Sequence, residues 1–141
     1  MPFDLKTAMA HRAPMLMVDE LLEVDKDTAL TSFEVKADNI FLDGSSGLLE
    51  RSALIEIMAQ ALAAKSAFKA YQDGLPTQKG FLVVLKNIDF LDDAKLGDTL
   101  KCQVKVADFI SQTYIANCKI TNNAGKTLAA GELRIYSFDK I

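Results

Sequence analysis

The sequence predicts an α+β fold in which one antiparallel sheet curls around a single long helix. One long apolar segment, "LERSALIEIMAQALAA" at residues 49–64, has the length and pattern of a helix. The other apolar segments are shorter, and they either alternate with polar residues or are rich in β-branched residues, as strands are. The predicted order is therefore two strands, one helix and four further strands.

The first predicted unit is a hairpin. Residues 15–24 are apolar enough for a buried strand, and residues 28–37 alternate loosely between apolar and polar side chains. Between them, "DKD" at 25–27 supplies the polar residues of a turn. We therefore expect two adjacent antiparallel strands at the start of the fold.

The predicted helix follows the polar stretch "LDGSSG" at 42–47 and runs to about Gln72, where "DGLP" ends it. At about 100° per residue, Arg51, Lys65 and Lys69 share one narrow arc. We expect this arc to face solvent and to offer the only local basic patch for an acidic partner. Glu56 lies on another side of the helix, in an apolar stripe.

Four strands are predicted after the helix, at residues 80–90, 99–107, 112–120 and 127–138, with "NNAG" at 122–125 as a turn. Cys102 and Cys118 fall on neighbouring predicted strands, and both are expected to point inward. Two cysteines are too few for a disulfide framework and have no metal-ligand spacing around them. Both are interpreted as reduced core residues.

Composition limits the classes of function. The chain has 141 residues, which suits a single domain over 1–141, and its net charge of -3 does not favour nucleic-acid binding. No apolar run approaches the roughly 20 residues that span a bilayer, so we expect a cytoplasmic protein without membrane insertion. The absence of a glycine-rich phosphate loop and of a metal-ligand cluster predicts no cofactor and no metal.

Glu56 is the residue that asks for an explanation. Burying a carboxylate costs several kcal/mol unless a partner compensates it. Under a structural interpretation, Glu56 sits at the edge of a packed face and is hydrogen-bonded to Gln60 one turn later. Under a functional interpretation, it is an acid held for chemistry. These residues by themselves leave both interpretations open.

Three segments carry a resemblance to a known family. "HRAPMLMVDELLEVD" at 11–25, "IEIMAQALAA" at 55–64 and "LKNIDFLDDAKLGDTLKCQVKV" at 85–106 resemble, in order and spacing, the hotdog-fold 3-hydroxyacyl-acyl carrier protein dehydratases of the FabZ and FabA type. The resemblance implies a sheet wrapped around the helix, a dimer with one continuous sheet, and an acyl tunnel at the dimer interface. Glu56, Ala59 and Gln60 match the family's E-x-x-A-Q pattern, whose glutamate is half of a catalytic dyad.

The chain departs from that family at the other half of the dyad. The family's histidine lies in a G-H-F-P-G loop before the helix, whereas this chain has "LDGSSGLLER" at 42–51 and no histidine there. The family's glycine-rich helix start has become Glu50 and Arg51. With its "E-x-M-A-Q-A-x-A-A" helix, the chain is more similar to the ApeP-like dehydratase branch, which is associated with aryl-polyene biosynthesis.

The resemblance implies that Glu56 is the catalytic acid. His11, the only histidine, lies in an entry segment to which the family assigns no dyad role, and it is a second catalytic candidate from its own or a neighbouring subunit. His11 stands beside Arg12 and Pro14 at a strand entrance, where a structural hydrogen-bonding role is the stronger interpretation. The expected substrate-binding residues are Gln60, Ala59 and Ala63 on the helix and, secondarily, the turn residues Asp43 and Ser45.

Three functions remain open at this stage. The first is a dehydratase, a lyase that acts on acyl thioesters carried by acyl carrier protein or coenzyme A. The second is an acyl thioesterase in which Glu56 attacks or activates water at a thioester carbonyl. The third is a non-catalytic partner of a true dehydratase, so both a homodimer or larger oligomer and a heterodimer with a dehydratase homologue are expected assemblies.

Overall fold

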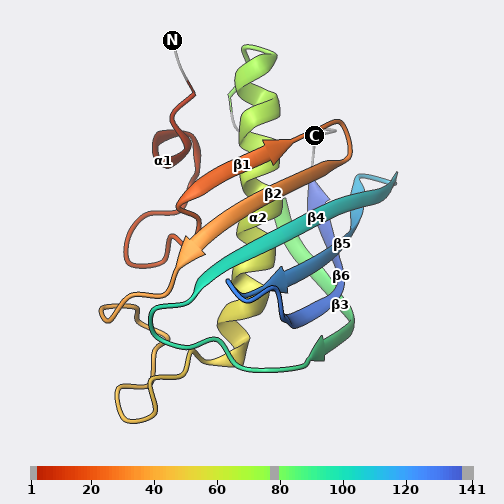
Figure 1. Cartoon of the computed structure of the whole chain (residues 1–141). Coiled ribbons are helices and arrows are strands. Elements are labelled where there is room, and N and C mark those ends of the chain that lie inside the picture. The colour runs from red at the N-terminus through yellow and green to blue at the C-terminus, as the bar shows by residue number, and fades with distance from the viewer. Residues whose placement is uncertain (1–2, 77–79, 138–141) are drawn as a thin grey trace.

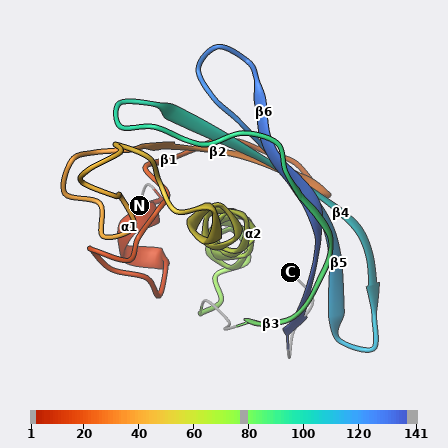
Figure 2. The same ribbon diagram turned by 90° about the horizontal axis from the view of Figure 1, so that it is seen from below.

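A six-stranded antiparallel sheet curves around one long helix in the computed structural model, which describes residues 3–76 and 80–137 (Figure 1). The strand order is β1-β2-β4-β5-β6-β3, so β1 and β3 form the two edges. Figure 2 views the helix α2 end-on, with the sheet on one side and the N-terminal segment on another. The elements are α1 (Leu5–Ala8), β1 (Glu20–Val24), β2 (Thr28–Glu34), α2 (Arg51–Gln72), β3 (Gly80–Phe90), β4 (Thr99–Ile110), β5 (Thr113–Thr121) and β6 (Thr127–Ser137).

The core lies between α2 and the concave face of the sheet. Strand β4 illustrates the pattern, because its residues from Thr99 to Val104 alternate strictly between exposed and buried. Alternation of period two places every second side chain on the core face, and the helix meets that face with its own apolar residues. The main contributors from α2 are Leu54, Ile57, Met58, Ala61 and Leu62, and those from the sheet include Leu100, Val104, Ile120 and Leu133.

The sequence predicted the elements well and their ends less well. Residues 15–19 are not part of β1, and β2 ends at Glu34 instead of residue 37. The cause in the first case is a side chain, because Gln60 hydrogen-bonds the backbone of Met15 and Met17, whose groups a strand would have paired. The helix α1 is only four residues long and was missed. Phe138, predicted to end the last strand, lies outside the described residues.

The prediction of a solvent-facing arc of three cations was wrong for Lys65. This side chain is only 3% exposed, and its Nζ donates a hydrogen bond to the Lys26 carbonyl at 2.8 Å. The β1–β2 turn folds over this side of α2, and the burial lowers the pKa of Lys65. Arg51 and Lys69 do stay exposed, so no cluster of three cations forms on the helix surface.

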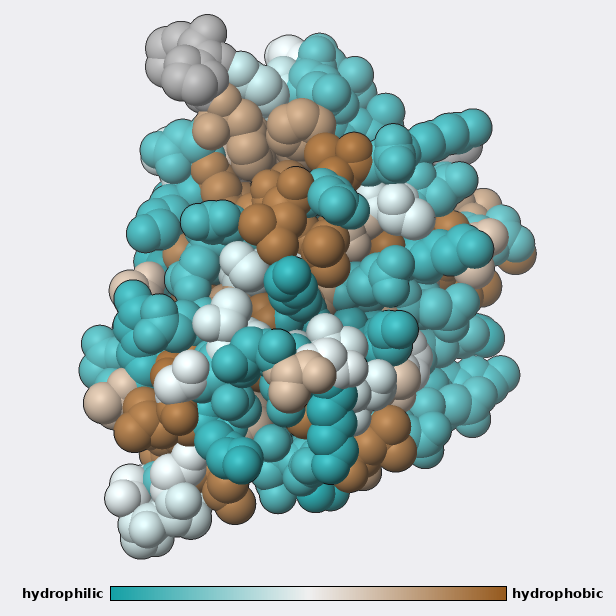
Figure 3. All heavy atoms as spheres, viewed as in Figure 1, coloured by the Kyte–Doolittle hydropathy of each residue, from teal (hydrophilic) through white to brown (hydrophobic). Residues whose placement is uncertain are grey.

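The two edges of the sheet differ in character. β1 carries the exposed carboxylates Glu20 and Glu23 and an irregular register, which are features that protect an edge from further pairing. β3 instead exposes Leu82 and Leu85, each 44% accessible, on the same face as the buried side chains of β6. The outer face of the sheet over β2 and β4 is mostly hydrophilic (Figure 3). β1 also exposes Leu22, at 41%, but the two carboxylates stand on either side of it in the sequence, so the more apolar edge is β3.

Cys102 and Cys118 are both buried free cysteines on the hairpin of β4 and β5, as predicted. Burial raises the pKa of Cys118 to about 12 and that of Cys102 well above its usual value. Because the thiolate is the reactive form, both should react with a thiol reagent only when the protein unfolds. As a matched control, Gln103→Cys places a thiol on the exposed face of the same strand and should be labelled rapidly. Rapid native labelling of both natural cysteines would contradict the observed phase of these strands.

Candidate functional site

Glu56 lies on the least buried face of α2. The side chains at 52, 55, 56, 59 and 63 on this face are exposed or half-buried, whereas Leu54, Ile57 and Met58 point into the core. The Glu56 side chain is 35% exposed, so its carboxylate sits at the boundary between the packed interior and the open side of the subunit. This differs from the sequence-based picture, in which Glu56 pointed away from the wet side of the helix.

Gln60 holds the carboxylate from one turn further along the helix. It is fully buried, and its Nε2 donates to Glu56 Oε1 at 3.0 Å and to the Met15 carbonyl at 2.7 Å. Its Oε1 accepts a hydrogen bond from the Met17 backbone N–H at 2.6 Å. Gln60 therefore fixes one carboxylate oxygen and also joins the helix to the chain that enters β1, a second role that its sequence position did not indicate.

The segment that leads into β1, residues 9–19, is called the entry segment here. It brings His11 close to Glu56 within one subunit. The His11 Nε2 lies 3.8 Å from Glu56 Oε1, and the two side chains are 32% and 35% exposed. The His11 Nδ1 is buried and has no hydrogen-bond partner among the described residues. Arg12 hydrogen-bonds the carbonyl oxygens of Met9 and His11 and so stiffens the segment. The expected structural hydrogen-bonding role of the His11 ring is not what these contacts provide.

Ala59 and Ala63 share the open face with Glu56 and are half-buried. Ala59 packs against the main core, whereas Ala63 packs against a second cluster formed by Met9, Val18 and Ala64. Ala59 therefore presents only a methyl group on the face that carries the carboxylate. The N-terminal segment covers the helix near Ala63.

Asp43 and Ser45 belong to a turn that satisfies its own polar groups. The Asp43 carboxylate accepts hydrogen bonds from the Ser45 N–H and hydroxyl and from the Ser46 hydroxyl. These bonds lower the pKa of Asp43. None of the hydrogen bonds given for this turn within the described part of the chain reaches Glu56, Gln60 or His11. The structure thus does not join the two turn residues to the candidate site.

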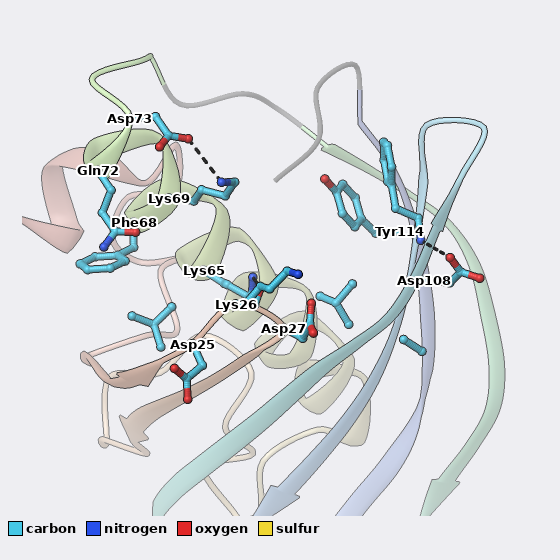
Figure 4. A pocket seen from close by; sticks show the side chains of 14 residues that line it. Asp25, Lys26, Asp27, Lys65, Phe68, Lys69, Gln72, Asp73, Asp108 and Tyr114 are labelled. Atoms are coloured by element: carbon cyan, nitrogen blue, oxygen red, sulfur yellow. Dashed lines mark hydrogen bonds and ion pairs between the residues drawn. The ribbon is translucent and has the colours of Figure 1, made fainter.

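A cavity of about 870 Å³ lies at the other end of α2 (Figure 4). It opens between the helix and the β4–β5 hairpin, and charged side chains of both signs line it, including the ion pair of Lys69 with Asp73. Neither Glu56 nor His11 contributes to it. In the described residues no group of three or more His, Cys, Asp or Glu side chains is arranged to hold a metal ion.

Comparisons with known proteins identify the family of this chain. Residues 3–141 match the family described as ApeP-like, ApeP dehydratase. The chain belongs to this family. It is also similar to two curated proteins named 3-hydroxyacyl-[acyl-carrier-protein] dehydratase FabZ. That of Fusobacterium nucleatum is 26% identical over 117 residues, covering 79% of each chain. That of Rhizobium johnstonii is 30% identical over 106 residues, covering 72% of this chain and 66% of the other.

Among solved structures, the ApeP-like chain resembles the dehydratase heterocomplex ApeI:P from Xenorhabdus doucetiae, with a TM-score of 0.87, 21% identity, and coverage of 99% of this chain and 94% of that one. It also resembles a hypothetical thioesterase with coenzyme A from Streptococcus pneumoniae, with a TM-score of 0.69, 15% identity, and coverage of 86% and 89%. At these identities the matches establish the hotdog fold. No helix in the described part of this ApeP-like protein is long and apolar enough to cross a membrane.

Removing the Gln60 amide should destabilise the ApeP-like subunit. In Gln60→Ala, the buried Met17 N–H loses its partner, which costs about 1–3 kcal/mol, and the part-buried Met15 carbonyl loses its hydrogen bond as well. Urea unfolding should therefore show a lower midpoint with an unchanged slope. Gln72→Ala, at an exposed position of the same helix, is the control and should be neutral. An unchanged midpoint for Gln60→Ala would mean that the entry segment is held by other contacts.

Proposed function

We propose that this protein dehydrates 3-hydroxyacyl thioesters and that Glu56 moves the protons. The observation that carries the proposal is the hydrogen bonding of the two Glu56 carboxylate oxygens on the open face of α2. Gln60 anchors Oε1, and no hydrogen bond from the described residues reaches Oε2. A carboxylate that is oriented but has one oxygen free is suited to proton transfer. Membership of the ApeP-like family supports the choice of dehydration over other reactions.

Dehydration requires that a proton is removed from the substrate Cα and that the hydroxyl group on Cβ is protonated as it leaves. One carboxylate can do both in turn. It accepts the Cα proton, and the resulting carboxylic acid returns that proton to the departing hydroxide, which leaves as water. The carboxylate is regenerated and the product is a 2-enoyl thioester. Negative charge develops on the thioester oxygen during this sequence and requires a hydrogen-bond donor.

The names of the relatives support a proposal for the substrate carrier and the partner. The FabZ proteins are named for acyl-carrier-protein substrates, and ApeI:P is described as a dehydratase heterocomplex. We extend both to this chain: an acyl thioester on acyl carrier protein or coenzyme A, in cytoplasmic fatty-acid or aryl-polyene biosynthesis. The second subunit is either another copy or a dehydratase homologue.

A thioesterase is the second candidate, because the chain also resembles a hotdog structure described as a thioesterase with coenzyme A. The same free carboxylate oxygen could activate water for attack on the thioester carbonyl. The two reactions differ in product, since hydrolysis releases a free thiol and dehydration does not. A non-catalytic subunit of a true dehydratase would do neither.

The Glu56→Gln variant tests the proposal. Turnover of a 3-hydroxyacyl thioester should fall by about 10²–10⁴ because the substitution removes the proton carrier. The melting temperature should stay the same or rise, since an amide keeps the shape and ends the partial desolvation of a charge. Glu23→Gln, at an exposed carboxylate of β1, is the matched control for both measurements.

Three results would contradict the dehydratase proposal. Stability lost with turnover unchanged would leave Glu56 as a structural residue. Release of thiol from a saturated acyl thioester, at the rate seen with the 3-hydroxyacyl substrate, would favour the thioesterase. If neither substrate is turned over until a histidine-bearing homologue is added, the non-catalytic subunit is favoured.

Dimerisation through the apolar edge is a further expected property of the proposed assembly. Leu85 lies on the apolar side of β3, and Leu85→Lys should convert a dimer into a monomer because it places a charge against the joining strand. Light scattering at micromolar concentration measures the change. Gln103→Lys adds the same charge on the exposed outer face of β4 and should leave the dimer intact. A wild-type chain that is monomeric alone and dimeric only with a homologue would replace the homodimer with the heterodimer.

A further inference from the structure

The hydrogen bonding around His11 restricts where its ring carries a proton. Nδ1 is buried without a partner among the described residues, whereas Nε2 faces the Glu56 carboxylate at 3.8 Å. Nδ1 lacks a partner there whichever ring nitrogen carries the proton, so the two tautomers differ in what Nε2 presents to the carboxylate: a bare Nε2 would set its lone pair against an anionic oxygen. An N–H at Nε2 points toward an anionic oxygen instead. Of the two neutral tautomers, the favoured one therefore carries its proton on Nε2.

This state makes His11 a poor proton carrier. To accept a proton at Nε2, the ring would first need its own proton at Nδ1, where it has no partner. To act as an acid from the neutral state, it would have to become an imidazolate. What the neutral ring can do is donate a fixed hydrogen bond through Nε2, as a preorganised donor does to an oxygen that gains charge.

We propose that His11 is a further catalytic residue of this site, and that its neutral Nε2–H binds the oxygen of the substrate thioester while Glu56 moves the protons. This inference rests on the dehydratase function proposed above. It assigns the two groups different tasks, and it takes the second group from the same subunit as the glutamate.

The geometry supports this assignment in two ways. The 3.8 Å separation of Nε2 and Oε1 is longer than a hydrogen bond, so each group can still form a hydrogen bond with a substrate. A thioester oxygen about 2.9 Å from Nε2 leaves the neighbouring Cα within reach of the carboxylate. The ring and the carboxylate are each about one-third exposed, which gives a substrate access from the open face of α2.

The position of His11 is fixed by contacts other than those of its ring. Gln60 binds the backbone at Met15 and Met17, and Arg12 binds the backbone at Met9 and His11. At the start of α2, Glu50 and Arg51 stand in place of the glycines that the family uses there. In the proposed site, the His11 Nε2–H, held in place by the backbone contacts of its segment, supplies the hydrogen-bond donor to the thioester oxygen.

The proposed step balances as follows. The Cα–H bond breaks and its proton passes to the Glu56 carboxylate, while the electron pair moves onto the thioester oxygen to give an enolate held by the His11 Nε2–H. The enolate then re-forms the carbonyl, the Cα=Cβ bond forms and the Cβ–OH bond breaks. The hydroxide takes the proton from Glu56 and leaves as water, and the His11 proton never leaves Nε2.

The first experiment observes the ring directly. His11 is the only histidine, so ¹⁵N NMR of the histidine-labelled protein reports one ring. At about pH 8, well above the ordinary range for histidine titration, Nε2 should be protonated and Nδ1 bare. Binding of a 3-hydroxyacyl amide analogue, which keeps the carbonyl but does not react, should move the Nε2–H proton downfield. A proton on Nδ1, or a bound analogue that leaves the Nε2–H unchanged, overturns the proposal.

The second experiment compares two variants. His11→Gln keeps a neutral N–H donor of similar reach, and His11→Phe keeps a ring without a donor. The kcat/KM should fall by about 10²–10³ in the Phe variant, as for a lost oxyanion donor, and by less than about tenfold in the Gln variant. Equal loss in both variants would identify a proton carrier, and no loss in either would leave a structural residue. Both results overturn the proposal.

The two proposals can fail separately. If the wild-type protein turns over no thioester, the dehydratase function falls, and the ring proton and the analogue-induced shift still decide whether His11 is a donor. Melting temperatures of both variants show whether a loss of activity reflects unfolding. If the Phe variant does not fold, the Gln variant and the ring spectrum decide the question.

Discussion

The buried amide of Gln60 is the interaction on which the rest of the site depends. A primary amide removed from water must find partners for its donors and its acceptor, and here they come from two elements. The backbone at Met15 and Met17 is drawn to the helix instead of extending β1, and the Glu56 carboxylate is fixed from one turn away. One side chain thus determines how the chain enters the sheet and how the acid is oriented, because hydrogen bonds in a dry environment are costly to leave unmade.

The two sides of α2 have opposite roles. On one side the β1–β2 turn covers the helix, where Lys65 is buried, its ammonium group donates to the Lys26 carbonyl, and Asp27 supplies a nearby opposite charge. A buried lysine is unfavourable unless hydrogen-bonded, and the Lys26 carbonyl meets that need. On the other side Glu56 remains accessible. The sheet itself ends at β3, where Leu82 and Leu85 are exposed.

The site also shows how a dehydratase-like chain can lack the family's loop histidine and still bring a histidine to its glutamate. The loop before α2 has become a turn in which Asp43 satisfies its own neighbours, so it offers little to a substrate. His11 reaches the carboxylate from the opposite direction, on a segment held by its backbone. Among the described residues the ring's Nδ1 has no hydrogen-bond partner, which is an unusual state for a buried polar atom.

The sequence by itself determined the parts of this protein that depend on local period. The helix, the strands and the inward direction of Cys102 and Cys118 follow from repeats of 3.6 and 2 residues, which the backbone imposes wherever a chain is helical or extended. Glu56 and Gln60 were found because a short motif spans one helical turn. Only the tertiary structure decided that Lys65 is buried, that residues 15–19 leave the strand, and that His11 meets Glu56. These depend on which distant segment folds over which face of the helix, and no local pattern encodes that choice.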